Sequence, residues 1–224
     1  MELKKISKEE LKEKLKLHEK WLNGEKEGVK LDLRNTDLRY TDLINANLKY
    51  ADLSYADLSC ANLRNVNLIH ADLKGVDLEG TDLSYADLRY SYLRYSYLGY
   101  ADLSYADLRC ADLRYADLNN SDLTNSDLRY ANLINANLSK TKFYLTNLYK
   151  AKGNFIGVEN IGSKNDTTYY FYSEDRIICD YFDGTMKEFE DKVKETYEKN
   201  SKEYKQYMIA INTLKKLAEL EGEK

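Results

Sequence analysis

The chain has 224 residues, of which 34 are Lys or Arg and 38 are Asp or Glu, for a formal net charge of −4. So small a charge argues against nucleic acid as a direct ligand. No apolar run reaches the length of about 20 residues that a membrane span needs, so we expect no membrane partner. The three cysteines form no C-x-x-C pair, which favours a reducing, cytoplasmic setting.

Residues 6–24 carry the signals of an amphipathic helix. Ser7 followed by Glu10 fits a capping box, and Gly24 fits a helix stop. An open end of a repeat would expose apolar surface and unpaired strand groups. We therefore expect residues 1–30 to form an N-terminal capping helix for the repeat that follows.

A five-residue repeat fills residues 31–150. Leu, once replaced by Phe, recurs at every fifth position from 33 to 148, giving 24 units, and a small residue stands two positions before it. A period of five cannot hold one face of an α-helix, which advances by about 100° per residue. The Ala-Asp-Leu triplet instead alternates inward, outward and inward, as a strand does. The chain must then turn at the two residues after each Leu, and repeated turns of one hand wind a coil.

The stretch "ADLSYADLSCANL" resembles the pentapeptide-repeat family, with its A(D/N)LXX units, over residues 31–150. This resemblance implies an all-β fold, a right-handed quadrilateral parallel β-helix with four units to a coil and so about six coils. We expect this β-helix to occupy residues 31–152. Some members of the family occupy the DNA-binding surface of gyrase, which implies a possible function.

Residues 153–224 predict a separate C-terminal module. The runs "TTYYFY" and "RIICDYF" flank "SED" and predict a β-hairpin. Thr185 and Glu188 open one α-helix, and a second is expected over residues 201–220. The stretch 161–193 resembles a short C-terminal module of many bacteriophage and prophage proteins, which implies a viral or mobile-element setting.

The slot before each Leu points outward and holds Asp in fifteen units and Asn in six. Residues twenty apart should stack on one face, which would line up carboxylates in columns. Two interpretations remain open: the columns mimic DNA phosphates, or each Asp or Asn accepts a backbone N–H at its turn. Free exchange of Asp with Asn favours the second. The candidate acidic face comprises Asp37, Asp57, Asp77, Glu79 and Asp117.

The stretch "YSYLRYSYLGY", residues 90–100, breaks the pattern because Tyr twice takes the outward slot. Two more Tyr hold the corner slots of the same units. One coil below them stand Gly75 and Gly80, so we expect an exposed aromatic patch over a glycine shelf. Exposed Tyr clusters are enriched at interfaces, although corner Tyr could merely cover backbone. The candidate protein-binding residues are Tyr92, Tyr95, Tyr97 and Tyr100.

Nothing in the sequence predicts catalysis. His18 and His70 have no partners at metal-ligand spacing, and Cys60 and Cys110 stand too far apart in the repeat to pair. No nucleophile-and-base arrangement or phosphate loop is present. We expect no enzyme, cofactor or metal site.

The sequence favours a non-enzymatic protein-binding scaffold, encoded by a phage or prophage, that engages a host protein through a β-helix face in the bacterial cytoplasm. The first alternative is a DNA-mimicking inhibitor or protector of DNA gyrase or topoisomerase. The second is a structural assembly element, monomeric or homodimeric through its C-terminal helices.

Overall fold

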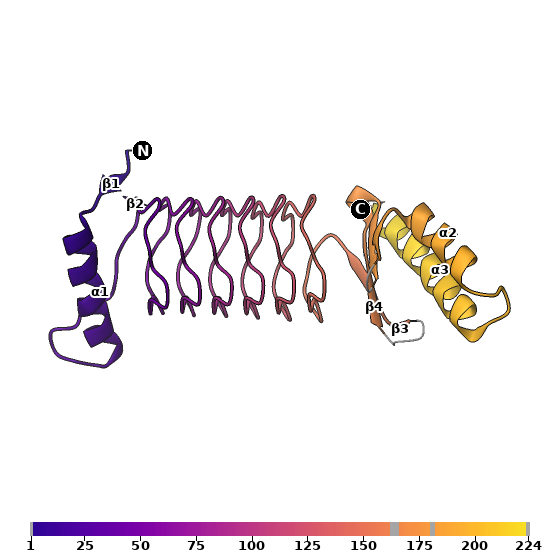
Figure 1. Cartoon of the computed structure of the whole chain (residues 1–224), viewed down its shortest axis with the longest axis horizontal. Coiled ribbons are helices and arrows are strands. Elements are labelled where there is room, and N and C mark those ends of the chain that lie inside the picture. The colour runs from indigo at the N-terminus through magenta and orange to yellow at the C-terminus, as the bar shows by residue number, and fades with distance from the viewer. Residues whose placement is uncertain (1, 162–165, 180–181, 223–224) are drawn as a thin grey trace. The chain divides into compact units, whose positions relative to one another are not determined.

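The computed structural model describes residues 2–161, 166–179 and 182–222 (Figure 1). The chain divides into two compact units, Met1–Gly153 and Asn154–Lys224. The first unit holds β1 (Lys4–Lys5), α1 (Lys8–Leu22), β2 (Thr36–Asp37) and the coiled repeat. The elements of the second unit are β3 (Ile156–Ile161), β4 (Asp166–Phe171), a 3-10 turn (Tyr172–Glu174), β5 (Arg176–Cys179), β6 (Phe182–Gly184), α2 (Met186–Thr196) and α3 (Lys202–Gly222).

The repeat folds as a quadrilateral parallel β-helix, visible as the row of coils in Figure 1. Parallel bridges join outward-slot residues twenty apart, from Asp32 with Asp52 to Asn132 with Lys152. The outward residue makes both bonds of each bridge: the Asp52 N–H donates to the Leu31 carbonyl at 3.1 Å, and the Leu33 N–H donates to the Asp52 carbonyl at 2.8 Å. A step of twenty residues is four five-residue units, one for each side of the coil.

Leu side chains fill the interior of the coil. Every centre residue from Leu33 to Leu148, Phe143 included, is at most 5% exposed. Each buried Leu contributes about 1.5–3 kcal/mol of gross transfer free energy. The Leu ladder is therefore the main source of stability in the first unit.

The corners explain why the period is five. The N–H of Ala46 donates to the Leu43 carbonyl at 3.0 Å, which closes a four-residue turn, and this bond recurs along the coil. The second corner residue has a positive φ in every unit, 58° at Asn45 for example. One left-handed residue per unit reverses the inward–outward alternation, so that the next Leu again points inward.

Side chains in the outward slot secure the corners. Oδ1 of Asp57 accepts the Ser59 N–H at 3.0 Å, and Oδ1 of Asn67 accepts the Ile69 N–H at 3.1 Å. Asp and Asn make the same bond at most other units, as residues that form Asx turns do. This bond is the physical reason that the two residue types exchange freely.

Helix α1 lies at the N-terminal end of the coils. Ser7 caps it by accepting the Glu10 N–H at 3.1 Å. A Schellman motif ends it: the Glu25 N–H donates to the Lys20 carbonyl at 2.9 Å, and Gly24 has a φ of 74°. The Leu31 N–H donates to Nδ1 of the fully buried His18 at 3.1 Å, which ties the helix to the first coil.

The C-terminal unit contains more strand than a hairpin. Its four-stranded antiparallel sheet has the order β3-β4-β5-β6, so the expected hairpin corresponds to β4 and β5, with one further strand on each side. The prediction missed β3 because "IGVENI" shows no clean alternation, and β6 because it has three residues. Asp180 and Tyr181, at the end of the predicted second strand, lie outside the described residues.

Both predicted C-terminal helices are present as α2 and α3. Thr185 and Glu188 form a complete capping box at the start of α2. Ile177 of the sheet packs with Phe189 of α2 and with Ile211 of α3 in a buried cluster. In the part of the chain that the structure describes, no helix is both long and apolar enough to cross a bilayer.

Asp77 tests the hydrogen-bonding role of the outward slot. Its Oδ1 accepts the Glu79 N–H at 3.0 Å, and its neighbour in the column is another carboxylate, Asp57. We expect Asp77→Asn to leave the melting temperature unchanged or slightly raised, because the acceptor stays and the repulsion goes. Asp77→Ala should lower the free energy of unfolding by about 1 kcal/mol. Thermal unfolding followed by circular dichroism measures both; equal losses would mean that the charge itself is needed.

His18 makes the attachment of α1 sensitive to pH. Burial lowers the pKa of His18 below its ordinary value of 6.5, and Nδ1 must stay unprotonated to accept the Leu31 N–H. A pKa lower in the folded than in the unfolded state means that protonation favours unfolding. The contribution of His18 is therefore present above about pH 6.5 and is lost as the pH falls below it.

We expect the melting temperature to fall between about pH 7.5 and 5.5, with a smaller fall in His18→Gln, whose side chain does not titrate. Thermal scans of both proteins across this range measure the difference. Parallel curves for the two proteins would contradict the assignment.

Candidate protein-binding surface

The second corner slots form four columns of side chains along the coil, because residues twenty apart lie above one another. Tyr85 stacks on Tyr105 with 4.8 Å between ring centroids, and Tyr95 stacks on Tyr115 at 5.0 Å. A left-handed backbone disfavours a Tyr, since its Cβ crowds the following carbonyl. Ring stacking at this spacing offsets that cost.

The longest aromatic column was not anticipated from the sequence. His18 stacks on Trp21, Trp21 meets Tyr50 edge-on, and Tyr50, His70 and Tyr90 stack in turn at 5.2 and 5.0 Å. The available signal was the aromatic side chain at 50, 70 and 90, a step of one coil. The column joins α1 to three successive coils.

We call Tyr92, Tyr95, Tyr97 and Tyr100 the tyrosine patch. Tyr92 and Tyr97 hold the outward slots of two adjacent faces, Tyr95 holds the corner between those faces, and Tyr100 holds the next corner. All four are exposed, by 46% at Tyr95 to 63% at Tyr100. The patch therefore brings four accessible aromatic side chains together in two consecutive units.

The glycine shelf expected beneath the patch is partly filled. A Cβ at Gly75 would lie 2.7 Å from ring atoms of Tyr55, so this glycine accommodates a ring from the coil before it. Beside Gly80, Sγ of Cys60 is the one atom within 4 Å of such a Cβ, at 3.6 Å. The ring of each corner Tyr leans toward the next coil along the chain. Tyr95 therefore packs against Tyr115 and not over Gly75. The expectation of an open shelf at Gly75 was wrong.

Arg94 is the residue that the break in the repeat leaves without its usual partner. In the next coil, Nε of Arg114 donates to Oδ1 of Asp112 at 2.7 Å. Tyr92 has no such acceptor, and Nε of Arg94 is buried without a hydrogen-bond partner among the described residues. The Arg94 guanidinium instead lies 5.4 Å from the centroid of the Tyr95 ring. A buried donor without an acceptor costs about 1–3 kcal/mol.

The candidate acidic face is partly neutralised at its N-terminal end. Arg39 pairs with Asp37 at 2.8 Å and approaches Asp57 at 3.6 Å. The hydrogen bond from Arg39 lowers the pKa of Asp37 to about 2. Three of the five carboxylates have no ion pair within the described ranges: Asp77, Glu79 and Asp117.

The face opposite the candidate acidic face carries a ladder of ion pairs. Each of its arginines binds the Asp two positions before it at 2.6 Å. Nε of Arg89 and of Arg109 also lie 3.6 Å from the Asp one coil further on. This face presents paired charge to the solvent. Its arginines are Arg89, Arg109 and Arg129.

The possible metal ligands and the cysteine thiols were compared in the described part of the chain. No group of three or more His, Cys, Asp or Glu there could hold a metal ion. Cys60 and Cys110 are free thiols. Cys179 is buried, and its Sγ accepts the Thr168 hydroxyl at 3.0 Å. The arrangement is suited to binding through side chains.

Several solved structures are similar to the repeat. HetL, a pentapeptide repeat protein involved in heterocyst differentiation regulation from Nostoc sp. strain PCC 7120, is 32% identical over 55% of this chain and 63% of its own, with a TM-score of 0.35. Rfr23 from Cyanothece 51142 is 25% identical over 60% of this chain and 89% of its own, with a TM-score of 0.25. QnrB1, a plasmid-mediated fluoroquinolone resistance protein, is 17% identical over 55% of this chain and 76% of its own, with a TM-score of 0.32.

The chain thus spans less than two thirds of HetL, and no curated protein matches it. The family described as pentapeptide repeats matches in eight copies over residues 31–65, 61–94, 86–125 and 106–144, just over half of the chain. With its twenty-residue bridges and buried Leu ladder, the chain belongs to the pentapeptide repeat family, whose members fold as right-handed quadrilateral β-helices.

Proposed function

We propose that this protein is a non-enzymatic scaffold that binds a partner protein through the tyrosine patch. One observation carries the proposal: Nε of Arg94 is buried without an acceptor among the described residues, and its guanidinium lies over the ring of Tyr95, one of the four exposed Tyr of the patch. An Asp at position 92 would satisfy that donor, as Asp112 satisfies Arg114. The chain gives up local stability here, and such departures from an otherwise consistent pattern concentrate at functional sites.

The chemistry of the patch suits a protein interface. Tyr and Arg are enriched among the residues that carry most of the binding energy at interfaces. Tyr95 already stacks on Tyr115, and the backbone at Tyr92 and Tyr97 is held by bridges on both sides. A preordered surface loses little conformational entropy on binding, which favours affinity.

The setting that we propose is a phage- or prophage-encoded protein acting on a host protein in the bacterial cytoplasm. The proposal rests on the resemblance of residues 161–193 to a module of phage proteins. The free thiols of Cys60 and Cys110 are consistent with a reducing compartment.

A second candidate is a DNA mimic directed at gyrase or topoisomerase. The observation in its favour is that Asp77, Glu79 and Asp117 carry charge on one face without an ion pair among the described residues. Against it, the outward slots of this face hold at most one carboxylate per coil, about 4.8 Å apart, and Tyr97 interrupts the column, whereas duplex DNA carries one charge per about 1.7 Å. A gyrase supercoiling assay with purified protein distinguishes this candidate: inhibition or protection at stoichiometric amounts would favour it.

A third candidate is an assembly element that dimerises through its C-terminal helices. Ile209 and Leu220 are exposed on α3, by 67% and 59%. Sedimentation velocity over a range of concentrations tests this candidate, since a homodimer would sediment faster as the concentration rises.

The double change Tyr92→Asp with Tyr97→Asp tests the tyrosine patch. It restores the repeat pattern and supplies an acceptor for Arg94, so we expect an unchanged or raised melting temperature. Partner capture from a bacterial lysate should fall by at least about tenfold, because two exposed aromatics are replaced by charges. Quantitative pull-down with thermal unfolding alongside measures both effects.

The matched control is Tyr85→Asn with Tyr105→Asn, which removes two exposed Tyr from a different corner at positions where Asn suits the left-handed backbone. Capture should survive this change. Undiminished capture by the folded Tyr92 and Tyr97 double variant would mean that the break in the repeat has no binding role.

A further inference from the structure

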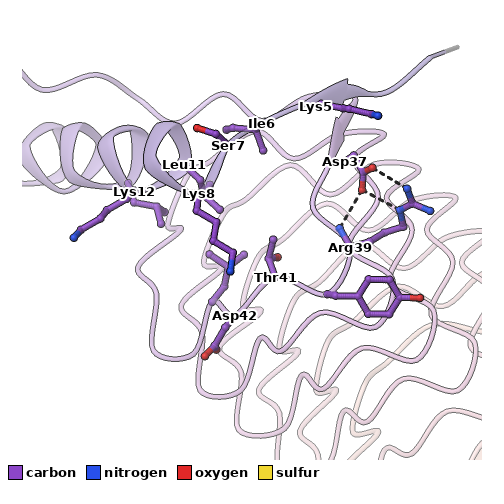
Figure 2. Close-up of a pocket in the computed structure, with 13 residues that line it drawn as sticks. Lys5, Ile6, Ser7, Lys8, Leu11, Lys12, Asp37, Arg39, Thr41 and Asp42 are labelled. Atoms are coloured by element: carbon purple, nitrogen blue, oxygen red, sulfur yellow. Dashed lines mark hydrogen bonds and ion pairs between the residues drawn. The ribbon is translucent and has the colours of Figure 1, made fainter.

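A cleft of about 790 Å³ lies between α1 and the first coil. Figure 2 shows α1 along one side of it and the segment with Thr41 and Asp42 along the other. Its apolar lining comes from Ile6, Leu11, Leu15 and Leu43. Leu15 and Ile6 are half-buried, so apolar surface remains accessible inside the cleft.

The cleft contains an unpaired strand edge. Throughout the coil, the outward residue of each unit bonds through both its N–H and its carbonyl to the coil before it, as Asn62 does with Thr41 and Leu43. The first coil has no coil before it. The N–H and carbonyl of Asp42 accordingly have no hydrogen-bond partner among the described residues. Such an edge is a template for another extended chain.

The neighbouring face of the same coil already pairs with an added strand. There β1 lies parallel to β2, with Lys5 opposite Asp37, and the Lys4 N–H donates to the Asn35 carbonyl at 2.7 Å. A short extended segment is therefore enough to pair with the open edge of the first coil. At Asp42 a backbone N–H and a backbone carbonyl are open to such a strand, with no partner among the described residues.

Charge indicates what the occupant carries. Four cationic and two anionic side chains line the cleft. One of the two anionic charges is neutralised inside the cleft, because Arg39 donates hydrogen bonds to Asp37, as the dashed lines in Figure 2 show. Lys8 and Lys12 are exposed and form no ion pair with the described residues. The cleft is therefore complementary to negative charge.

We propose that this cleft binds an extended, acidic peptide segment of a partner protein, which pairs with the backbone of Asp42 as an added strand. Alternate side chains of such a segment point to opposite sides, so apolar ones enter the pocket of Leu11, Leu15 and Leu43 while acidic ones face Lys8 and Lys12. The site is separate from the tyrosine patch and does not depend on it. A fatty acid would match the apolar lining and the lysines but has no groups for the Asp42 N–H and carbonyl.

The direct test uses fluorescein-labelled heptapeptides of alternating Glu and Leu, with Lys-and-Leu counterparts, and measures binding by fluorescence anisotropy. The variant Asp42→Pro removes the edge N–H. Asp42→Ala is its control, because both variants lose the bond that the Ile44 N–H donates to the Asp42 carboxylate. We expect the Ala variant to bind the acidic peptide at least as tightly as the parent, because it loses an anionic side chain of the cleft. The Pro variant should bind about threefold to tenfold more weakly than the Ala variant, because it also lacks the edge N–H.

A charge exchange tests the site without touching the coil. We expect Lys8→Glu with Lys12→Glu to weaken the acidic peptide by at least about tenfold, and Lys16→Glu with Lys26→Glu, an equal change on exposed residues outside the cleft, to weaken it less than about threefold. Preference for the basic peptide, equal effects of both pairs, or no binding of the acidic peptide would overturn the proposal. Displacement of the peptide by decanoate, together with equal affinities of the Pro and Ala variants, would identify an amphiphile site and also overturn it.

Discussion

The backbone bonds between each outward residue and the coil before it are the constraint on which the first unit depends. They use the N–H and carbonyl of the middle residue of every unit, as for Asp52 with Leu31 and Leu33. Because these bonds involve only backbone, the outward side chain can change without breaking them, as Tyr92 and Tyr97 show. The same bonds explain both candidate surfaces: one arises where the outward side chain changes, and the other where the series of coils begins.

The tyrosine patch, which we propose as a binding surface, leaves the backbone of the repeat unaltered. Tyr92 and Tyr97 keep their bridges to the coils on both sides, so the fold tolerates them. The cost falls on side chains, chiefly on Arg94, whose Nε loses its acceptor. The patch is less stable than a regular unit of the repeat would be at the same place, but it exposes aromatic side chains. Selection for binding would produce this combination.

The peptide site that we propose beside α1 would use a different mode of recognition. There the backbone of Asp42 would be the principal contact, and side chains of α1 contribute to the apolar lining and the positive charge. His18 holds α1 to the first coil, so the shape of the cleft depends on a buried, neutral imidazole. One scaffold can in this way present a side-chain surface along the coil and a backbone edge at its end.

The sequence by itself determined the features of the repeat unit, which are the inward Leu, the corner after it and the outward Asp or Asn. It also determined the start of α2 at Thr185. These depend on residues within five positions of one another, so local rules suffice. The structure alone decided which partners meet across coils: the Tyr55 ring over Gly75, Arg39 shared between Asp37 and Asp57, and the aromatic column from His18 to Tyr90. The contacts between coils join residues about one coil apart in the chain, such as Tyr55 with Gly75 and Arg39 with Asp57. The direction in which a side chain leans depends on packing that no local pattern encodes. For the same reason β3, β6 and the open edge at Asp42 became evident only when the chain had folded.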